Sequence, residues 1–390
     1  MTIALHGQAT YGPLQGVRII EFAGIGPAPF AAMMLADAGA EIIRIDRLSQ
    51  TTSPWQSDAY PDLLNRGRPS VAVDLKHPEG KKLAFRLIQR ADGLIEGFRP
   101  GVMERLGLGP SVCLDLHRRL VYGRITGWGQ DGDLSQRAGH DINYIALSGA
   151  LGAFGRAGER PLAPLNLVGD FGGGGMMLAF GMLAAIIHAS ETGTGQVVDA
   201  AMVDGASLLM TMIYGMRTQG IWTDQRGTNL LDTGAHFYEV YETSDGKFMA
   251  VGALEPQFYK ELIRLMGLVE ENLPQQMDRE SWPRMKVRFT EIFVGKSRAE
   301  WEVVFAGSDA CVTSVLSMKE ALENPHLIHR KTFAEVDGVV QPSPAPRFSA
   351  TPGSIQRPPS LPGQDANEVL TNWSISEEEI DRLRQTGVIL

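Results

Sequence analysis

The sequence predicts an α/β protein: a large domain built on a mostly parallel sheet, and a smaller α+β domain. Apolar, β-branched runs alternate with helical stretches in the first third of the chain, an order typical of parallel sheets covered on both faces. A length of 390 residues exceeds what one compact core usually holds, which favours two domains. A change of pattern near residue 225 indicates where the second domain begins.

The expected large domain comprises residues 1–220, completed by 326–390. Its strands are expected at 17–23, 40–46, 70–75, 93–98 and 119–126, with a further strand in the QVVDA stretch that follows Thr192–Gly195. Its helices are expected at 28–38, from Pro78 to about residue 91, and at 141–152, 172–189 and 200–219.

The expected small domain comprises residues 225–325. Two strands, 236–243 and 247–253, flank Asp245–Gly246, which is a strong hairpin signal. Helices are expected at 256–267, 280–293 and 298–306. The Pro-rich stretch 340–365 is interpreted as an extended connection, and Ser376 with Glu379 as a capping box for a last helix.

The charge distribution excludes some classes of partner. A net charge of −9 argues against nucleic acid and anionic membranes, both of which need a basic face. Residues 1–110 hold 12 Lys and Arg against 11 Asp and Glu, whereas the rest of the chain holds 24 against 34. An anionic ligand would therefore be least repelled by the N-terminal part, although a mixed solvated surface explains the same counts.

Other features predict a cytoplasmic protein without a metal or a membrane segment. Cys113 and Cys311 are too far apart in sequence to indicate a disulfide framework or a zinc site, and no further ligands complete a set with His326 and His329. The first ten residues lack the pattern of a signal peptide. The apolar run Phe171–Ile187 falls short of the roughly 20 residues that span a bilayer, so a buried helix is expected.

The turn Gly24–Pro29 follows a strand and precedes a helix, and it half matches the dinucleotide fingerprint G-x-G-x-x-G. Asp46 ends the next strand, about where a ribose-binding acid would lie. However, Pro29 replaces the third glycine, whose role is close helix–strand packing. A tight strand-to-helix turn is therefore favoured over NAD binding.

Three polar residues stand at expected helix starts. His140 lies in GHDINY, and histidine is the usual acid or base near neutral pH, although a lone histidine is more often structural. Asp170 precedes four glycines; an N-cap explains the aspartate, but the glycines also allow a close approach by a ligand or another backbone. Glu255 precedes Pro256, and taken alone it is an acidic residue at a helix start.

The motifs together resemble the family III coenzyme A transferases and, within them, the α-methylacyl-CoA racemases. The resemblance runs through GPLQGVRIIEFAGIGPAP, GAEIIRIDR, EGFRPGVMERLGLGP, AGHDINY, PLNLVGDFGGGG and VGALEPQFY, and it covers about residues 12–350. It implies a large Rossmann-like domain plus a small domain. It also implies an obligate homodimer of interlocked chains, whose active site lies between the large domain of one chain and the small domain of the other.

The resemblance implies the chemistry as well. The transferases use one aspartate as a nucleophile, which Asp170 matches; the racemases add a histidine and a glutamate, which His140 and Glu255 match. Racemisation of a 2-methylacyl-CoA needs a base and an acid on opposite faces of an enolate. His140 would take the proton from one enantiomer and Asp170 from the other, while Glu255 of the partner subunit would bind the imidazole. The backbone N–H of Asp170 is the expected donor to the enolate oxygen.

By the same resemblance, the N-terminal part binds coenzyme A, and no metal or other cofactor is expected. Arg47, Lys76, Arg99 and Arg105 would meet phosphates. The other expected contacts are Ile25, Val73, Asp74, Leu75, Gly97, Phe98, Gly139, Asp141, Ile142, Asn143 and Tyr144. Met210, Met212 and Met216 are candidates for the acyl pocket, because methionine adapts to varied shapes.

Two other functions remain open at this point. One is a coenzyme A transferase with Asp170 as nucleophile, and the other is a non-catalytic protein that binds coenzyme A or a nucleotide. The sequence does not specify which 2-methylacyl group is the physiological one.

Overall fold

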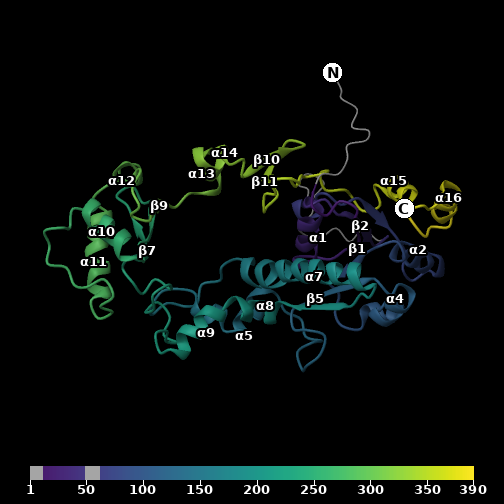
Figure 1. Ribbon diagram of the computed structural model, residues 1–390, viewed down its shortest axis with the longest axis horizontal. Helices are drawn as coiled ribbons and strands as arrows, with labels where there is room; N and C mark the ends of the chain where they lie inside the picture. The colour runs from purple at the N-terminus through teal and green to yellow at the C-terminus, as the bar shows by residue number, and fades with distance from the viewer. Residues whose placement is uncertain (1–11, 49–61) are drawn as a thin grey trace, which may run out of the picture. The chain divides into compact units, whose positions relative to one another are not determined.

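A computed structural model describes residues 12–48 and 62–390. The first residues of the chain, which lack a signal-peptide pattern, lie outside the described part. The chain separates into two compact units (Figure 1). The first takes the chain up to Ser148, Leu165–Leu209 and His329–Leu390, and the second takes Gly149–Pro164 and Met210–Ile328.

The first unit is built on a six-stranded sheet in which every neighbouring pair is parallel. Its strands are Arg18–Phe22 (β1), Glu41–Asp46 (β2), Ser70–Ala72 (β3), Gly93–Glu96 (β4), Val121–Thr126 (β5) and Val197–Ala201 (β6). Their order is β3-β2-β1-β4-β5-β6, the order of a Rossmann sheet. The predicted α/β class is confirmed, and the direction of winding reverses between β1 and β4.

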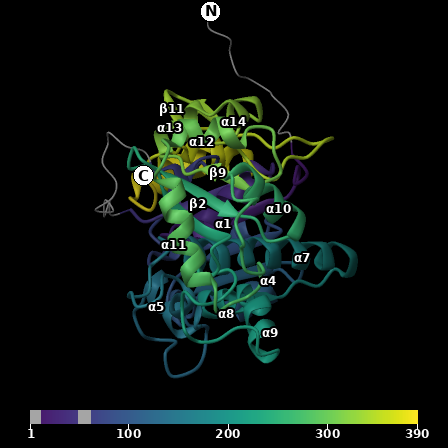
Figure 2. The same cartoon turned by 90° about the vertical axis from the view of Figure 1, so that its left-hand side faces the viewer.

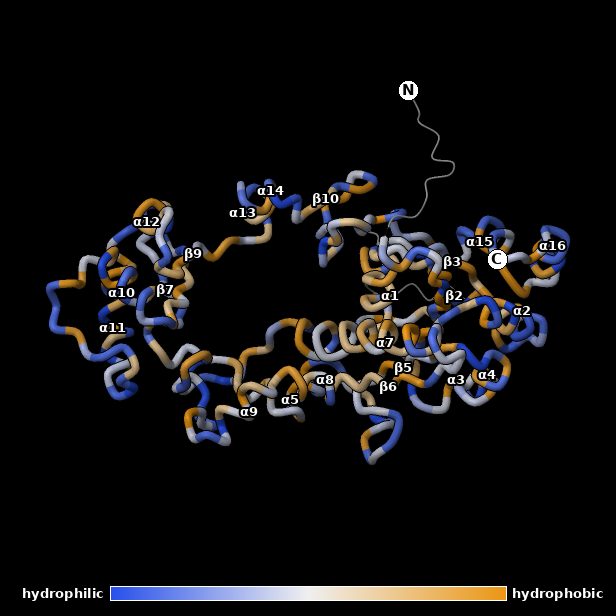
Figure 3. Tube along the Cα trace, in the orientation of Figure 1, coloured by the Kyte–Doolittle hydropathy of each residue, from blue (hydrophilic) through white to orange (hydrophobic). Residues whose placement is uncertain are grey.

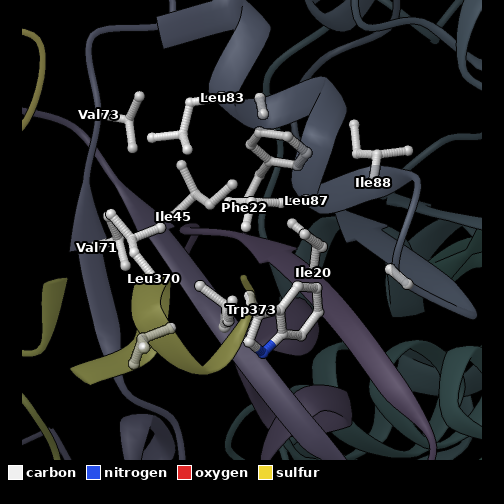
Figure 4. Packing of buried hydrophobic residues seen from close by; sticks show 14 of the residues in the cluster. Ile20, Phe22, Ile45, Val71, Val73, Leu83, Leu87, Ile88, Leu370 and Trp373 are labelled. Carbon is white, nitrogen blue, oxygen red and sulfur yellow. The ribbon is translucent and has the colours of Figure 1, made fainter. Parts of the chain in front are cut away.

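One face of this sheet is covered by helix Pro78–Ile88 (α2) and by two helices from the end of the chain, Ala366–Asn372 (α15) and Glu377–Gln385 (α16). Figure 4 shows Leu370 and Trp373 of the C-terminal segment packed among Ile20, Phe22 and Ile45 of the sheet. The last residues therefore complete the core of the first unit.

The opposite face is covered by helices Pro27–Asp37 (α1) and Met177–Thr192 (α7), and α1 lies close against the sheet in both views (Figures 1 and 2). Consecutive residues Ile19 and Ile20 of β1 belong to different cores, one on each side. Since both faces are buried, the strand sequences are largely apolar, as parallel strands usually are, and the charged residues Glu21, Arg44 and Arg124 within them are also buried.

The remaining elements of this unit lie in its loops and at its edges. They are Leu63–Asn65 (η1), Val102–Leu106 (α3), Pro110–Leu116 (α4), Asp141–Leu147 (α5), Leu167–Met176 (η2), Met202–Leu209 (α8), Phe333–Val336 (β10) and Val339–Pro342 (β11). Strand β3 is shorter than predicted: it ends at Ala72, and Val73 forms an isolated antiparallel bridge with Ile389. The start of the predicted Pro-rich connection forms β11, which pairs with β10.

The second unit contains a three-stranded antiparallel sheet of Tyr238–Glu242 (β7), Phe248–Gly252 (β8) and Val312–Ser314 (β9). The predicted hairpin joins β7 to β8, and Gly246 has the positive φ of 69° that its turn needs. Its helices are Ala150–Ala153 (α6), Thr211–Thr218 (α9), Pro256–Leu265 (α10), Trp282–Phe293 (α11), Arg298–Phe305 (α12), Met318–Glu323 (α13) and Pro325–His329 (α14). Tyr241 stacks on Phe293 at 4.9 Å between ring centroids within its core.

Two segments that were expected in the large domain, 149–164 and 210–220, group with this second unit. Arg226 holds the first segment through the carbonyl of Gly152 at 3.0 Å. The helix predicted at 200–219 is divided into α8 and α9, whose bounds meet at Met210.

The predicted buried helix is longer than its apolar run, because η2 continues directly into α7. Together they span Leu167–Thr192, 26 residues, and the most apolar 18-residue window has a mean hydropathy of 1.6 and is 39% buried. This helix is long and apolar enough to cross a membrane by length and composition, so the argument from a short run is wrong. Figure 3 shows mostly apolar colours along α7 and much blue over α16. Leu178 and Met182 of α7 nevertheless pack into the sheet's core.

Candidate active site

The candidate site lies at the carboxyl edge of the parallel sheet, where ligands bind in open α/β folds. The winding reverses between β1 and β4, so the turn after β1 and the loop that begins at Gly97 flank the expected crevice. A Cβ at Gly97 would lie 3.3 Å from the Cβ of Ala28, which shows how closely α1 approaches the end of β4. A glycine suits this position because it leaves room for α1.

The turn Gly24–Gly26 brings the start of α1 against Asp170. Gly26 has a φ of 70°, and a Cβ there would lie 3.4 Å from Oδ2 of Asp170. Helix α1 begins at Pro27, directly after this turn, and Ile25 is 76% exposed beside it. The tight strand-to-helix turn expected from the sequence is present.

Asp170 lies inside the π-helical stretch η2, not at the N-cap position that the sequence offered as one explanation. The four glycines after it permit backbone contacts. A Cβ at Gly173 would lie 2.6 Å from the backbone nitrogen of Ala206, and a Cβ at Gly205 only 1.8 Å from the carbonyl oxygen of Gly173. η2 and α8 therefore pack backbone against backbone, and π-helical turns are frequent at functional sites.

Asp141 reaches from α5 to clamp the backbone at Asp170. Its Oδ2 accepts hydrogen bonds from the N–H groups of Gly169 at 2.6 Å and Asp170 at 2.8 Å. A Cβ at Gly169 would lie 2.5 Å from this oxygen, so the approach requires glycine. The N–H of Asp170 is therefore already engaged, and the expectation that it donates to an enolate oxygen is wrong. Asp141 was expected to contact coenzyme A, yet it is only 5% exposed.

The carboxyl group of Asp170 is half-buried, and this burial raises its pKa. A hydrogen bond from Nδ2 of Asn166, at 3.1 Å to Oδ2, lowers the pKa again, as does the nearby imidazole of His140, while the negative charge of Asp141 raises it. Burial dominates, so Asp170 is protonated more readily than an exposed aspartate. Sequence reasoning missed Asn166, although it stands four residues before Asp170 in the quoted motif.

His140 occupies the N-cap position of α5, and its side chain is exposed. Its backbone N–H donates to Oδ1 of Asn143 at 3.0 Å. The residue before it, Gly139, is held by Tyr144, whose hydroxyl donates to the Gly139 carbonyl and whose ring packs edge-on against Trp128 at 4.8 Å. The backbone at His140 is thus fixed, while the imidazole stays accessible to a substrate.

Tyr144 was expected to contact coenzyme A, but in this structure it packs inside the protein. A Cβ at Gly127 would lie 2.0 Å from its ring. The side chain is 6% exposed, and burial raises its pKa to about 12. Ile142 and Asn143 on the same helix are exposed.

A hollow of about 470 Å³ lies beside α5. Asn143 lines it and also accepts the His140 N–H, so the hollow adjoins the imidazole's own loop. Its other lining residues are Trp128, Leu134, Arg137, Ala138, Ala146 and Leu147. A mostly apolar lining with one cation suits a chain that carries polar groups at intervals.

The four cations expected to meet phosphates are all exposed: Arg47, Lys76, Arg99 and Arg105. The guanidinium of Arg47 lies over the ring of Phe98, 5.8 Å from its centroid. The N–H of Phe98 donates to Glu96 at 2.8 Å, which orders the loop after β4. These contacts link the loops after β2 and β4 at the carboxyl edge of the sheet.

Two of the coenzyme A contacts expected after β3, Val73 and Leu75, have side chains that pack in the protein core. Val73 is 2% exposed and packs in the core, and Leu75 packs against the same core. Asp74 accepts the N–H of Lys76 at 2.9 Å, while its own N–H donates to Val388 at 2.9 Å. The C-terminus of the chain therefore fixes this loop.

Glu255 belongs to the second unit, where it is the exposed N-cap residue of α10, directly before Pro256. The structure thus brings His140 and Asp170 together within the first unit and carries Glu255 on a different unit. In the described residues, no group of three or more His, Cys, Asp or Glu side chains is arranged to hold a metal ion.

The sequence matches the family described as CoA-transferase family III over residues 14–366. The chain belongs to CoA-transferase family III. The resemblance inferred from the motifs is confirmed.

Within this family, the chain is 46% identical to the α-methylacyl-CoA racemase of Mus musculus and 44% identical to that of Homo sapiens. Each alignment covers 96% of this chain and 97% of the racemase. The chain is 26% identical to the succinyl-CoA:glutarate CoA-transferase of Homo sapiens. That alignment covers 97% of this chain and 90% of the transferase.

Solved structures share the fold. A CAIB/BAIF family protein from Brucella suis has a TM-score of 0.80 at 21% identity, covering 93% of this chain and all of that one. Rv3272 from Mycobacterium tuberculosis has a TM-score of 0.76 at 26% identity, and the match covers 91% of this chain and 98% of Rv3272. The fold of this chain is therefore shared with proteins of known crystal structure.

Proposed function

We propose that this protein racemises 2-methylacyl-CoA thioesters, removing the α-proton from one face of the substrate and returning a proton to the other. The observation that carries the proposal is the hydrogen bond from the Asp170 N–H to Asp141, which directly follows His140 and so brings His140 and Asp170 to one site. The near full-length similarity to two α-methylacyl-CoA racemases supports the same reaction.

The reaction needs two groups in opposite protonation states. The thioester carbonyl acidifies the α-hydrogen, and a neutral imidazole at His140 can accept it as the enolate forms. Asp170, whose pKa is raised by burial, then donates a proton to the opposite face. For the other enantiomer the two groups exchange roles, so neither direction consumes a co-substrate.

Asp141 serves this scheme without touching the substrate. Its carboxylate fixes the backbone at Gly169 and Asp170, and its negative charge raises the pKa of the Asp170 carboxyl. The clamp and the charge thus come from one side chain. Asn166 has the opposite effect, because the hydrogen bond that it donates to the Asp170 carboxyl lowers the pKa of that group.

The coenzyme A moiety would lie along the carboxyl edge of the sheet. The exposed cations Arg47, Lys76, Arg99 and Arg105 would meet its phosphates, and the hollow beside α5 would hold part of the pantetheine arm near His140. Helix α9 buries none of its residues, which leaves Met212 and Met216 accessible to an acyl chain. No metal or second cofactor takes part in this proposal, and the protein would work in the cytoplasm.

The proposal includes an obligate, interlocked homodimer in which Glu255 of the partner subunit reaches His140. A carboxylate bound to one imidazole nitrogen fixes the ring's orientation and raises its basicity. The exposed position of Glu255 at the start of α10 supports such a contact.

Solvent exchange tests the function directly. In D₂O, the wild-type protein is expected to place deuterium at the α-carbon of a 2-methylacyl-CoA while inverting it, with no acid added. A coenzyme A transferase would instead need an acid co-substrate and would form an acyl intermediate on Asp170. Coenzyme A binding without any exchange would show a non-catalytic protein and would refute the proposal.

A further inference from the structure

The backbone directly before Glu255 is held by one side chain from a distant loop. Nε2 of Gln276 donates to the carbonyl of Ala253 at 3.0 Å and to the carbonyl of Leu254 at 2.9 Å. These are the last two carbonyls before Glu255, at the connection between β8 and α10. A single amide group therefore sets the direction in which the chain enters the helix.

Gln276 is itself anchored by a buried aromatic residue. Its backbone carbonyl accepts from Nε1 of Trp282 at 2.9 Å. Trp282 is 3% exposed and packs edge-on against Phe237, with 5.8 Å between ring centroids. The carbonyl of Phe237 in turn accepts the N–H of Ala253 at 3.0 Å, which closes the loop of contacts around the connection.

A second contact fixes the other side of Glu255. The N–H of Tyr259 donates to the carbonyl of Glu255 at 3.0 Å, the first helical bond of α10. The hydroxyl of Tyr259 lies 2.9 Å from Nε2 of His236, which is completely buried. The ring of His236 packs edge-on against Phe237 and Phe289, each at 5.0 Å between centroids.

His236 works as a neutral group. Burial, together with the positive charge of Lys286, lowers the pKa of His236 to about 4. Its link to Tyr259 is therefore an uncharged hydrogen bond at any pH where the protein would be active.

The carboxylate of Glu255 has no such support of its own. Within residues 12–48 and 62–390, no hydrogen bond or ion pair holds its oxygens, so its position depends on the backbone. A misplacement of about 1 Å can cost on the order of 100-fold in rate when a group must meet a partner in a fixed geometry. The placement of the Glu255 carboxylate therefore depends on how precisely the backbone around it is held.

We infer that Gln276 and the His236–Tyr259 pair are positioning residues that aim Glu255 at the imidazole of His140. The inference rests on the proposed function, in which Glu255 binds that imidazole. Gln276 acts on the two carbonyls before Glu255, and Tyr259 acts on the carbonyl of Glu255 itself. Neither touches the substrate.

The variant Gln276→Leu tests the inference, with Gln275→Leu as the matched control, since Gln275 is exposed and adjacent. Gln276→Leu is expected to lower kcat for α-hydrogen exchange on the order of 10-fold with KM unchanged. The basic group in its kcat/KM profile is expected to titrate at lower pH, because the imidazole loses its carboxylate. Gln275→Leu is expected to match wild type.

A second background separates positioning from folding. In Glu255→Gln, which lacks the group to be aimed, adding Gln276→Leu is expected to have no further effect on kcat. Tyr259→Phe, a smaller change that keeps the ring, is expected to behave in the same way with a smaller loss. Equal losses from Gln276→Leu in both backgrounds, or no loss in either, would overturn the positioning role. A Glu255→Gln variant with wild-type kinetics would instead overturn the role proposed for Glu255, and the positioning role with it.

Discussion

Asp170 and Glu255 are two acidic residues at the start of helical segments, and their surroundings differ in almost every respect. Asp170 is half-buried in a π-helical turn, with its backbone N–H held by another carboxylate. Glu255 is exposed, and the chain before it is held through its carbonyls by an amide. The first environment favours a carboxyl that carries a proton, whereas the second suits a carboxylate that only binds a neighbour.

The largest expected difference between the two acids is in rate. Asp170→Asn should lower α-hydrogen exchange on the order of 1,000-fold, because it removes a proton-transfer group. Glu255→Gln should lower it on the order of 10-fold, because it removes only an orienting partner. Steady-state exchange rates in D₂O measure both. Equal losses from the two variants would contradict the division of roles.

The packing beneath Asp170 should tolerate no added atom. Gly205→Ala would place a Cβ 1.8 Å from the carbonyl oxygen of Gly173, so the free energy of unfolding should fall by about 3 kcal/mol. The control is Gly215→Ala in α9, where a Cβ meets nothing within 4 Å. It should raise stability by up to about 1 kcal/mol. Denaturant unfolding measures both, and a neutral Gly205→Ala would contradict the close backbone contact.

The region around Glu255 should respond to acid through His236. Its pKa is about 4 when folded against an ordinary value of 6.5, so the unfolded chain binds the extra proton first as the pH falls. The contribution of His236 to the free energy of unfolding is fully present above about pH 6.5, and about 2 kcal/mol of it should be lost by pH 5. His236→Gln should lack this contribution. Unfolding of both proteins at pH 7.5 and 5 measures the difference, and identical pH dependence would refute it.

The smallest expected effect concerns the charge of Asp141. Asp141→Asn keeps an oxygen that can accept from the N–H groups of Gly169 and Asp170 but removes the negative charge that raises the pKa of Asp170. The pKa of Asp170 should therefore fall, and the limb of the pH–rate profile that reports its acid form should move to lower pH. A profile that moves to higher pH would contradict the claim that the charge of Asp141 raises the pKa of Asp170.

The sequence predicted the sheet well, because strands such as 17–23 and 119–126 are rich in apolar and β-branched residues and alternate along the chain with helical stretches. It missed what depends on distant partners. Strand β3 ends at Ala72, and Val73 forms a bridge with Ile389, more than 300 residues away. The divided helix at Met210 and the boundaries of the second unit likewise follow from contacts between segments far apart in the chain.

The site shows the same division. The motifs predicted His140, Asp170 and Glu255, and the four glycines correctly indicated a close approach. They did not indicate that the approaching group is the backbone of α8, nor that Asp141 occupies the N–H of Asp170. Gln276 lies 21 residues after Glu255 in a loop without a motif, so only the folded chain brings it to the connection before α10.

Separate enantiomers of one 2-methylacyl-CoA give the most direct test of proton transfer by two opposed groups. In D₂O, wild type should exchange and invert both enantiomers. His140→Ala should lose exchange from one enantiomer and keep slow exchange from the other, and Asp170→Asn should show the reverse. Loss of exchange from the same enantiomer in both variants, or unchanged exchange in both, would contradict the placement of His140 and Asp170 on opposite faces of the substrate.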